Sequence, residues 1–156
     1  MNILSLDIST KSTGFGFFKN CKLGKFHGSI KTSDGFEDMY EKVRNLIKNL
    51  HEKYGVNTIV VEDVYYSRNQ KVFKTLAFLQ GMIFGFCKEL GITVEFMLPA
   101  SWRKILGLNK KGAKRDELKK RAIEYVKDTL GIEVKDDDEA DGICIGLAFI
   151  KKNKLG

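Results

Sequence analysis

The order of the apolar segments is the feature of this sequence that most limits its fold. Residues 2–9 (NILSLDIS) alternate apolar and polar side chains, as a strand does, and residues 15–19 and 22–31 predict two further strands. The segments between them are short and rich in turn residues, the first at Lys11–Gly14, so we expect antiparallel hairpins. The chain therefore predicts a three-stranded antiparallel unit before its first helix.

Helices and strands alternate in the rest of the chain. Apolar residues at helical spacing predict an amphipathic helix over 36–50, and two short apolar strands are predicted at 58–62 and 92–98. A helix at 69–89 lies between these strands, which implies a right-handed crossover and parallel pairing. The expected fold class is α/β, with a five-stranded mixed sheet, three strands antiparallel and then two parallel, flanked by helices.

The helix at 69–89 has more apolar surface than one small sheet can cover. One stripe contains Val72, Leu76, Leu79, Ile83 and Phe86, and a second contains Phe73, Ala77, Phe84 and Cys87. Two apolar faces on one helix indicate either a centrally buried helix or a subunit interface. A basic segment with a helix near 113–130, an acidic loop and an apolar helix from about 138 to 150 complete the chain.

Length and composition indicate one globular domain. The chain has 156 residues, of which 43% are hydrophobic and 30% charged, and this size leaves little room for a second domain. No apolar run is long enough to span a membrane, and Asp7 interrupts the first apolar segment, which argues against a signal peptide. The three cysteines and two histidines lack the spacing of zinc ligands, so we expect reduced cysteines and a cytoplasmic protein.

The net charge of +7 is concentrated in one segment. Residues 103–121 contain nine basic and two acidic residues, whereas the remainder has 18 of each sign because the chain holds 27 basic and 20 acidic residues. A concentrated basic surface suits a polyanion, of which nucleic acid is the commonest. A solvated lysine-rich helix would have the same composition, so charge alone leaves both interpretations open.

Four carboxylates lie where folding alone would not place them. Asp7 ends the first apolar strand and Glu62 ends the fourth, and these two strands should be neighbours in the centre of the sheet. Asp138 and Asp141 are three residues apart at the start of the last helix, which is almost entirely apolar afterwards and must pack against the core. Burying such charges is costly unless they are paired or bind a metal ion.

Oxygen ligands without histidine or thiolate favour Mg²⁺ or Mn²⁺ over zinc. Two such ions can activate a water molecule and stabilise the leaving oxygen of a phosphodiester. Each carboxylate also has a simpler explanation: Asp138 as a helix cap, Asp141 as a residue favoured by the helix dipole, Asp7 as a strand end and Glu62 as a surface residue. The four together favour a metal site.

Four segments follow one another along the chain: LDISTKSTGFGFF (6–18), IVVEDVYYSRN (59–69), the QG of FLQG (78–81) and DEADGICIG (138–146). In their residues, order and spacing they resemble the RuvC family of Holliday junction resolvases, especially its compact phage-type branch. The resemblance implies one RNase H-like nuclease domain over 1–156. It also implies a metal-dependent endodeoxyribonuclease of DNA recombination and repair, which cuts Holliday junctions and other branched DNA and leaves a 5′-phosphate and a 3′-hydroxyl.

The resemblance assigns roles to the four carboxylates. Asp7 resembles the family's bridging metal ligand, and Glu62 resembles the second carboxylate, at the end of the fourth strand. Asp138 and Asp141 match the pair at the start of the last helix. Together they imply two Mg²⁺ or Mn²⁺ ions in each active site.

The resemblance also identifies DNA contacts. Tyr65 or Tyr66, followed by Arg68, matches a position where an aromatic residue stacks on bases at the branch point. Lys114 lies near the family's lysine that contacts the scissile phosphate, with Lys110, Lys111 and Arg115 as alternates and further DNA contacts. Trp102 could stack on DNA, although packing beside its apolar neighbours is more usual for a lone tryptophan.

The helix at 69–89 corresponds to the family's dimer helix, so we expect a homodimer whose two sites each cut one strand of the junction. The basic segment differs from that of the cellular enzymes, which leaves open any sequence preference at the cut site and any branch-migration motor as a partner. No obligatory protein partner is evident.

Two other functions are compatible with the same residues: a YqgF-like nuclease acting on RNA, and a non-catalytic protein that binds branched DNA. An ATP-binding domain of the actin and sugar-kinase class is not expected, because it would need a second glycine-rich phosphate loop and a second lobe, and 156 residues hold neither.

Overall fold

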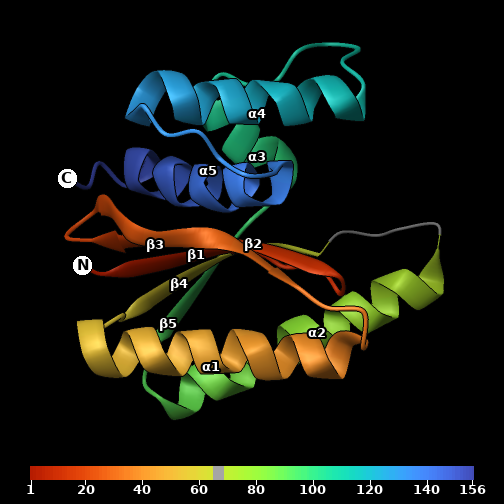
Figure 1. The fold of residues 1–156 in the computed structure, drawn as a ribbon, viewed down its shortest axis with the longest axis vertical. Coiled ribbons are helices and arrows are strands. Elements are labelled where there is room, and N and C mark those ends of the chain that lie inside the picture. The colour runs from red at the N-terminus through yellow and green to blue at the C-terminus, as the bar shows by residue number, and fades with distance from the viewer. Residues whose placement is uncertain (65–68) are drawn as a thin grey trace.

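Five strands form one mixed sheet in the order β3-β2-β1-β4-β5 in the computed structural model, which describes residues 1–64 and 69–156 (Figure 1). The strands are β1 (Ile3–Asp7), β2 (Ser12–Lys19), β3 (Lys22–Lys31), β4 (Thr58–Glu62) and β5 (Thr93–Met97). The first three strands pair antiparallel, whereas β1–β4 and β4–β5 pair parallel. The predicted α/β class and mixed sheet are confirmed, and β1 and β4 are adjacent at its centre.

Helices cover both faces of this sheet. The described residues form α1 (Phe36–Tyr54), α2 (Gln70–Glu89), α3 (Pro99–Ile105), α4 (Arg115–Leu130) and α5 (Asp137–Lys152). Figure 1 shows α1 and α2 on one face and α5 on the other, with α4 as an outer layer beyond α5. No helix of the described residues is long and apolar enough to cross a membrane.

The alternating side chains of β1 divide the interior into two cores. Leu4 and Leu6 are fully buried in the core that also contains residues of α1 and α2. Ile3 points the opposite way, into the core that contains Ile143 and other residues of α5. Ser5 is fully buried as well, and its hydroxyl donates a hydrogen bond of 2.6 Å to the backbone carbonyl of Gly142 in α5.

Glycines allow α5 to approach the sheet at backbone contact distance. A Cβ atom on Gly14 would lie 1.6 Å from the backbone oxygen of Asp138, and one on Gly142 would lie 2.4 Å from the backbone nitrogen of Phe15. Because no side chain fits in such a gap, only glycine is compatible with this packing. The close approach places the start of α5 beside the carboxyl end of β1.

Two details of the sequence prediction are wrong. The turn predicted at Lys11–Gly14 is shorter, since β2 begins at Ser12 and its first residues pair with β3. Helix α3 was not predicted, because seven residues are too few to show helical periodicity. Its only local signal is Pro99 at the first helical position, where the missing backbone N–H costs nothing.

Helix α2 is buried on one side only. Leu79, Ile83, Phe86 and Cys87 are buried, which accounts for part of the two predicted stripes. The outer face exposes the large apolar side chains of Phe78, Met82 and Phe84, whereas the exposed Val72 lies near the start of the helix, in the stripe of the buried Leu79 and Ile83. A centrally buried helix is therefore excluded for α2 in this structure, and its outer apolar face needs another explanation.

Candidate active site

The four predicted carboxylates converge at one end of the sheet. Asp7 and Glu62 are the last residues of the adjacent parallel strands β1 and β4. Asp138 and Asp141 lie in the first two turns of α5, which packs across these strands. Burial raises the pKa of Asp7 well above its usual range, and the charges of Glu62, Asp141 and Asp138 raise it further. The four groups are thus within electrostatic reach of one another.

Burial raises the pKa of Asp7, Glu62 and Asp141 and so makes these three carboxylates costly to ionise. It raises the pKa of Asp141 to about 7, against the opposing charge of Arg103. It also raises the pKa of Glu62, although a hydrogen bond from Trp102 and the charge of Arg103 lower it again. A divalent cation at this position would favour the ionised form of every carboxylate around it.

Hydrogen bonds from neighbouring elements hold two of the carboxylates. The hydroxyl of Ser12 in β2 donates to Oδ2 of Asp138 at 2.6 Å. The indole N–H of Trp102 in α3 donates to Oε2 of Glu62, also at 2.6 Å. The side-chain amide of Gln80 in α2 donates to the backbone carbonyl of Glu62 at 3.2 Å. Residues of three elements therefore orient the site.

Arg103 is a site residue that the sequence reasoning missed. It was counted only as part of the basic segment, yet its side chain is 17% exposed and its Nη2 lies 3.9 Å from Oδ2 of Asp141. Its guanidinium group stacks over the ring of Trp102, with the central carbon 4.4 Å from the ring centroid. The half-buried guanidinium group of Arg103 thus partly offsets the negative charge of the carboxylate cluster.

The donor set fits Mg²⁺ or Mn²⁺. Oδ1 of Asp141 is buried and accepts no hydrogen bond from the described residues, so a cation ligand would satisfy an otherwise unpaired oxygen. Within residues 1–64 and 69–156, no group of three or more Asp, Glu, His or Cys side chains is arranged so that it could hold a metal ion as a complete protein site. Mg²⁺ does not require one, because it is commonly bound by one or two carboxylates, water and substrate phosphates.

The start of α5 is anchored by residues that the sequence analysis did not single out. The helix cap is Asp136, whose side chain accepts from the backbone N–H of Glu139, so Asp138 is not the cap. Asp136 also accepts a hydrogen bond of 2.8 Å from the hydroxyl of Ser29 in β3. The buried carboxylate of Glu139 lies 2.6 Å from Nδ1 of His27, likewise in β3. These contacts hold the helix end that carries Asp138 against the sheet.

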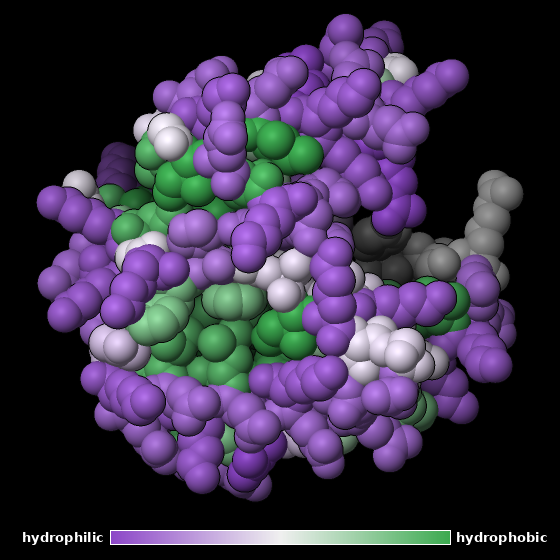
Figure 2. All heavy atoms as spheres, viewed as in Figure 1, coloured by the Kyte–Doolittle hydropathy of each residue, from purple (hydrophilic) through white to green (hydrophobic). Residues whose placement is uncertain are grey.

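The predicted basic DNA contacts lie between α3 and α4 and at the start of α4. Lys110, Lys111, Lys114 and Arg115 are all exposed. Nζ of Lys110 pairs with Glu117 at 3.0 Å, so part of its charge is already compensated. Figure 2 shows hydrophilic side chains over α4, in the upper part of that view.

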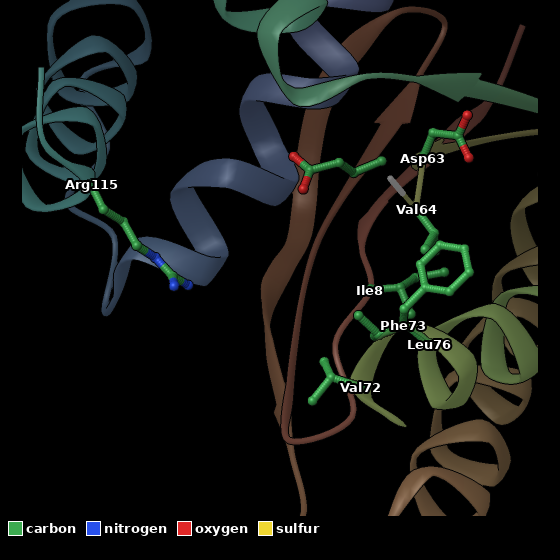
Figure 3. A pocket seen from close by; sticks show the side chains of 8 residues that line it. Ile8, Asp63, Val64, Val72, Phe73, Leu76 and Arg115 are labelled. Atoms are coloured by element: carbon green, nitrogen blue, oxygen red, sulfur yellow. The ribbon is translucent and has the colours of Figure 1, made fainter. Parts of the chain in front are cut away.

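A pocket of about 300 Å³ adjoins the carboxylates. It is lined by Ile8, Glu62, Asp63, Val64, Val72, Phe73, Leu76 and Arg115. Figure 3 shows Arg115 reaching in from α4 on the side opposite Ile8, Phe73 and Leu76. Tyr65, Tyr66 and Arg68, the predicted base-stacking segment, lie outside the described residues.

The sheet order, the packing of α5 across it and the carboxylates at the ends of β1 and β4 define the RuvC type of the RNase H-like fold. The RuvC structure from T. thermophilus in complex with a Holliday junction substrate superposes with a TM-score of 0.78 at 16% identity, covering 100% of this chain and 96% of that one. The chain belongs to the DUF3882 family, described as Lactococcus phage M3 protein, whose model matches residues 1–152.

Other comparisons agree with this assignment. The fowlpox virus Holliday junction resolvase has a TM-score of 0.60 at 17% identity, over 98% of this chain and 99% of that one. The protein named crossover junction endodeoxyribonuclease RuvC in Syntrophomonas wolfei is 26% identical over 165 residues, 99% of this chain and 91% of that protein. Its namesake in Fusobacterium nucleatum is 27% identical over 163 residues, 100% of this chain and 82% of that protein. The resemblance to RuvC-type resolvases is confirmed.

Proposed function

We propose that this chain is a structure-selective endodeoxyribonuclease that cuts Holliday junctions and other branched DNA by metal-dependent hydrolysis. The convergence of Asp7, Glu62, Asp138 and Asp141 on adjacent elements carries the proposal. Curated relatives named crossover junction endodeoxyribonuclease, and a similar structure bound to a Holliday junction substrate, support the choice of DNA. Residues 1–156 would act as one nuclease domain in the cytoplasm of a bacterium, encoded by the cell or by a phage.

Asp7, Glu62, Asp138 and Asp141 would hold two divalent ions of the Mg²⁺ or Mn²⁺ type. Bound there, such ions supply an activated water and stabilise the leaving oxygen of the cut phosphodiester. The residues of the chain itself orient the ligands, because Ser12 holds one oxygen of Asp138 by a hydrogen bond of 2.6 Å. Asp141 is buried and Asp7, Glu62 and Asp138 are half-buried, and this partial exclusion of water would strengthen their attraction for the ions.

The exposed basic residues would bind the DNA backbone beside the cut. Lys114 is our choice for the contact to the scissile phosphate, and Arg115 follows it and lines the pocket that includes Glu62. Lys110 and Lys111 extend this basic surface. Stacking of Tyr65 or Tyr66 on an unpaired base, with Arg68 beside it, stays a prediction of the family resemblance.

We further propose a homodimer formed through α2. The side chains of Phe78, Met82 and Phe84 on its outer face are 52%, 37% and 38% exposed. The apolar surface continues onto β5, since the rings of Phe84 and Phe96 lie 6.1 Å apart. Two copies related by a twofold axis would present two active sites to the near-symmetric arms of a junction.

Phe78→Glu tests the dimer. It should turn the protein into a monomer in sedimentation analysis and convert paired cuts into single nicks, because a carboxylate would be buried in an apolar interface. Lys22→Glu, which introduces the same carboxylate at an exposed position of the edge strand β3, serves as the control. A wild-type protein that stays monomeric when bound to junction DNA would contradict the dimer.

The nuclease itself is tested with end-labelled four-way junction, fork, linear duplex and RNA hairpin substrates in Mg²⁺ or Mn²⁺. Metal-dependent nicking of branched DNA is expected for the wild type and for Asp34→Asn, which changes an exposed carboxylate outside the site. Asp7→Asn should bind the junction without cutting it. Cleavage of RNA alone would favour a YqgF-like nuclease, and tight binding without cleavage by the wild type would favour a non-catalytic binder.

A further inference from the structure

The single tryptophan of the chain lies between the hydrophobic core and the carboxylate cluster. Trp102 is fully buried and packs in the same core as Met97 and Leu106. At the edge of its ring, the indole N–H donates a hydrogen bond of 2.6 Å to Oε2 of Glu62. One side chain therefore belongs both to the core and to the site.

This hydrogen bond restricts a side chain that would otherwise rotate. The terminal torsion of a glutamate has a broad energy minimum, so the position of its oxygens depends on their partners. The indole N–H is a donor only, and full burial holds the ring that carries it. Because the bond fixes Oε2, it also fixes where Oε1 and the remaining lone pair of Oε2 can meet a cation.

The backbone around Glu62 is held as well, so the whole residue is fixed from two sides. The amide of Gln80 in α2 donates to the Glu62 carbonyl at 3.2 Å. On the other side of the site, Arg103 stacks on the ring of Trp102 and lies 3.9 Å from Asp141. Two consecutive residues of α3 thus contact carboxylates from β4 and from α5.

We propose that Trp102 is a positioning residue of the active site, which orients Glu62 for a divalent cation through its indole N–H. The inference rests on the proposed function, and it assigns to Trp102 a role that a tryptophan used only for packing would not have. Hydrogen-bond donors behind metal-binding carboxylates typically contribute about 10- to 100-fold to metal affinity or activity. We expect a loss in that range when the N–H is removed.

The hydrogen bond can be tested without metal. Since the chain has one tryptophan, a ¹H–¹⁵N spectrum contains one indole N–H signal. Glu62→Ala removes the acceptor, and it should shift this signal and speed its exchange with solvent relative to the wild type. Asp34→Asn, on the surface, should leave the signal in place. An indole signal that is the same in wild type and Glu62→Ala would overturn the proposal.

The functional consequence is tested with two replacements of Trp102. Trp102→Phe keeps an aromatic ring but leaves space in the core. Incorporation of β-(3-benzothienyl)alanine in place of tryptophan keeps the volume and exchanges the N–H for sulfur, and it alters only this position. Leu106→Ala is the matched control, because it weakens the same core without a polar contact to the site.

Calorimetric titration with Mn²⁺ and junction cleavage provide the readouts. Both replacements of Trp102 should weaken Mn²⁺ binding and lower kcat by about 10- to 100-fold with little change in KM. Leu106→Ala should lower stability but bind Mn²⁺ as the wild type does. If the benzothienyl protein binds Mn²⁺ and cuts like an active wild type, this inference alone fails. A wild type that neither binds Mn²⁺ nor cuts would overturn the proposed function and the inference together.

Discussion

Replacing Gly142 with alanine tests whether the backbone contact between α5 and β2 sets the geometry of the active site. A Cβ atom at this position would lie 2.4 Å from the backbone nitrogen of Phe15 and 2.5 Å from the backbone carbon of Gly14. Ordinary van der Waals contact begins at 3.4 Å, so α5 and β2 must separate by about 1 Å. Both obstructing atoms belong to the backbone, so neither can move aside by a rotamer change.

The magnitude follows from three contributions. Forcing an extra methyl group into a well-packed contact costs about 1–3 kcal/mol. Displacing the hydrogen bond that Ser5 donates to the carbonyl of Gly142 costs about 1 kcal/mol, and the higher helix propensity of alanine offsets about the same amount. The free energy of unfolding should fall by about 1–3 kcal/mol. A 1 Å displacement of Asp138 and Asp141 from Asp7 should lower kcat roughly 100-fold.

Urea denaturation and junction cleavage measure the two effects. Gly16→Ala is the matched control, because its Cβ atom would also face α5 but would lie 3.3 Å from Cα of Ile143, so a few tenths of an ångström would relieve the contact. We expect this control to remain close to the wild type in stability and cleavage. If Gly142→Ala is as stable and as active as Gly16→Ala, the backbone contact does not position the carboxylates.

Three further predictions concern charge. In the folded protein the pKa of Asp141 is about 7, above its usual 3.8, so ionisation of this carboxyl opposes folding as the pH rises between these values. Without divalent cations, Asp141→Asn should therefore raise the free energy of unfolding by up to about 4 kcal/mol above pH 7 and leave it unchanged below pH 4. A difference in thermal melts that does not depend on pH would contradict this. Mg²⁺ at about 100 times its Kd should stabilise the wild type by about 2.7 kcal/mol and Asp7→Asn far less, and equal shifts in Tm would remove Asp7 from the site. Changing Lys110, Lys111 and Lys114 to alanine should reduce the slope of log K against log salt by up to about 3, and an unchanged slope would exclude this segment from the DNA interface.

Local pattern was enough to predict the sheet and its carboxylates. The alternation of residues in β1 reflects the two cores on either side of it, with Leu4 facing one and Ile3 the other. Because parallel neighbours end at the same edge of a sheet, Asp7 and Glu62 at the ends of two apolar segments had to lie together. The apolar stretch after Asp141 likewise required α5 to pack against the core, and its glycines show how closely it does so.

The tertiary structure decided which residues support those carboxylates. Trp102 and Arg103 lie 40 and 41 positions after Glu62 in a short helix without detectable periodicity, so no spacing in the sequence connects them to the site. The pairing of His27 with Glu139 joins β3 to α5 across 112 positions in the same way. A sequence shows how apolar and polar residues are spaced along the chain, and this spacing predicts the strands, the helices and the residues at which strands end. Contacts between side chains of elements far apart in the sequence depend on how those elements pack in three dimensions, and only the folded structure shows that packing.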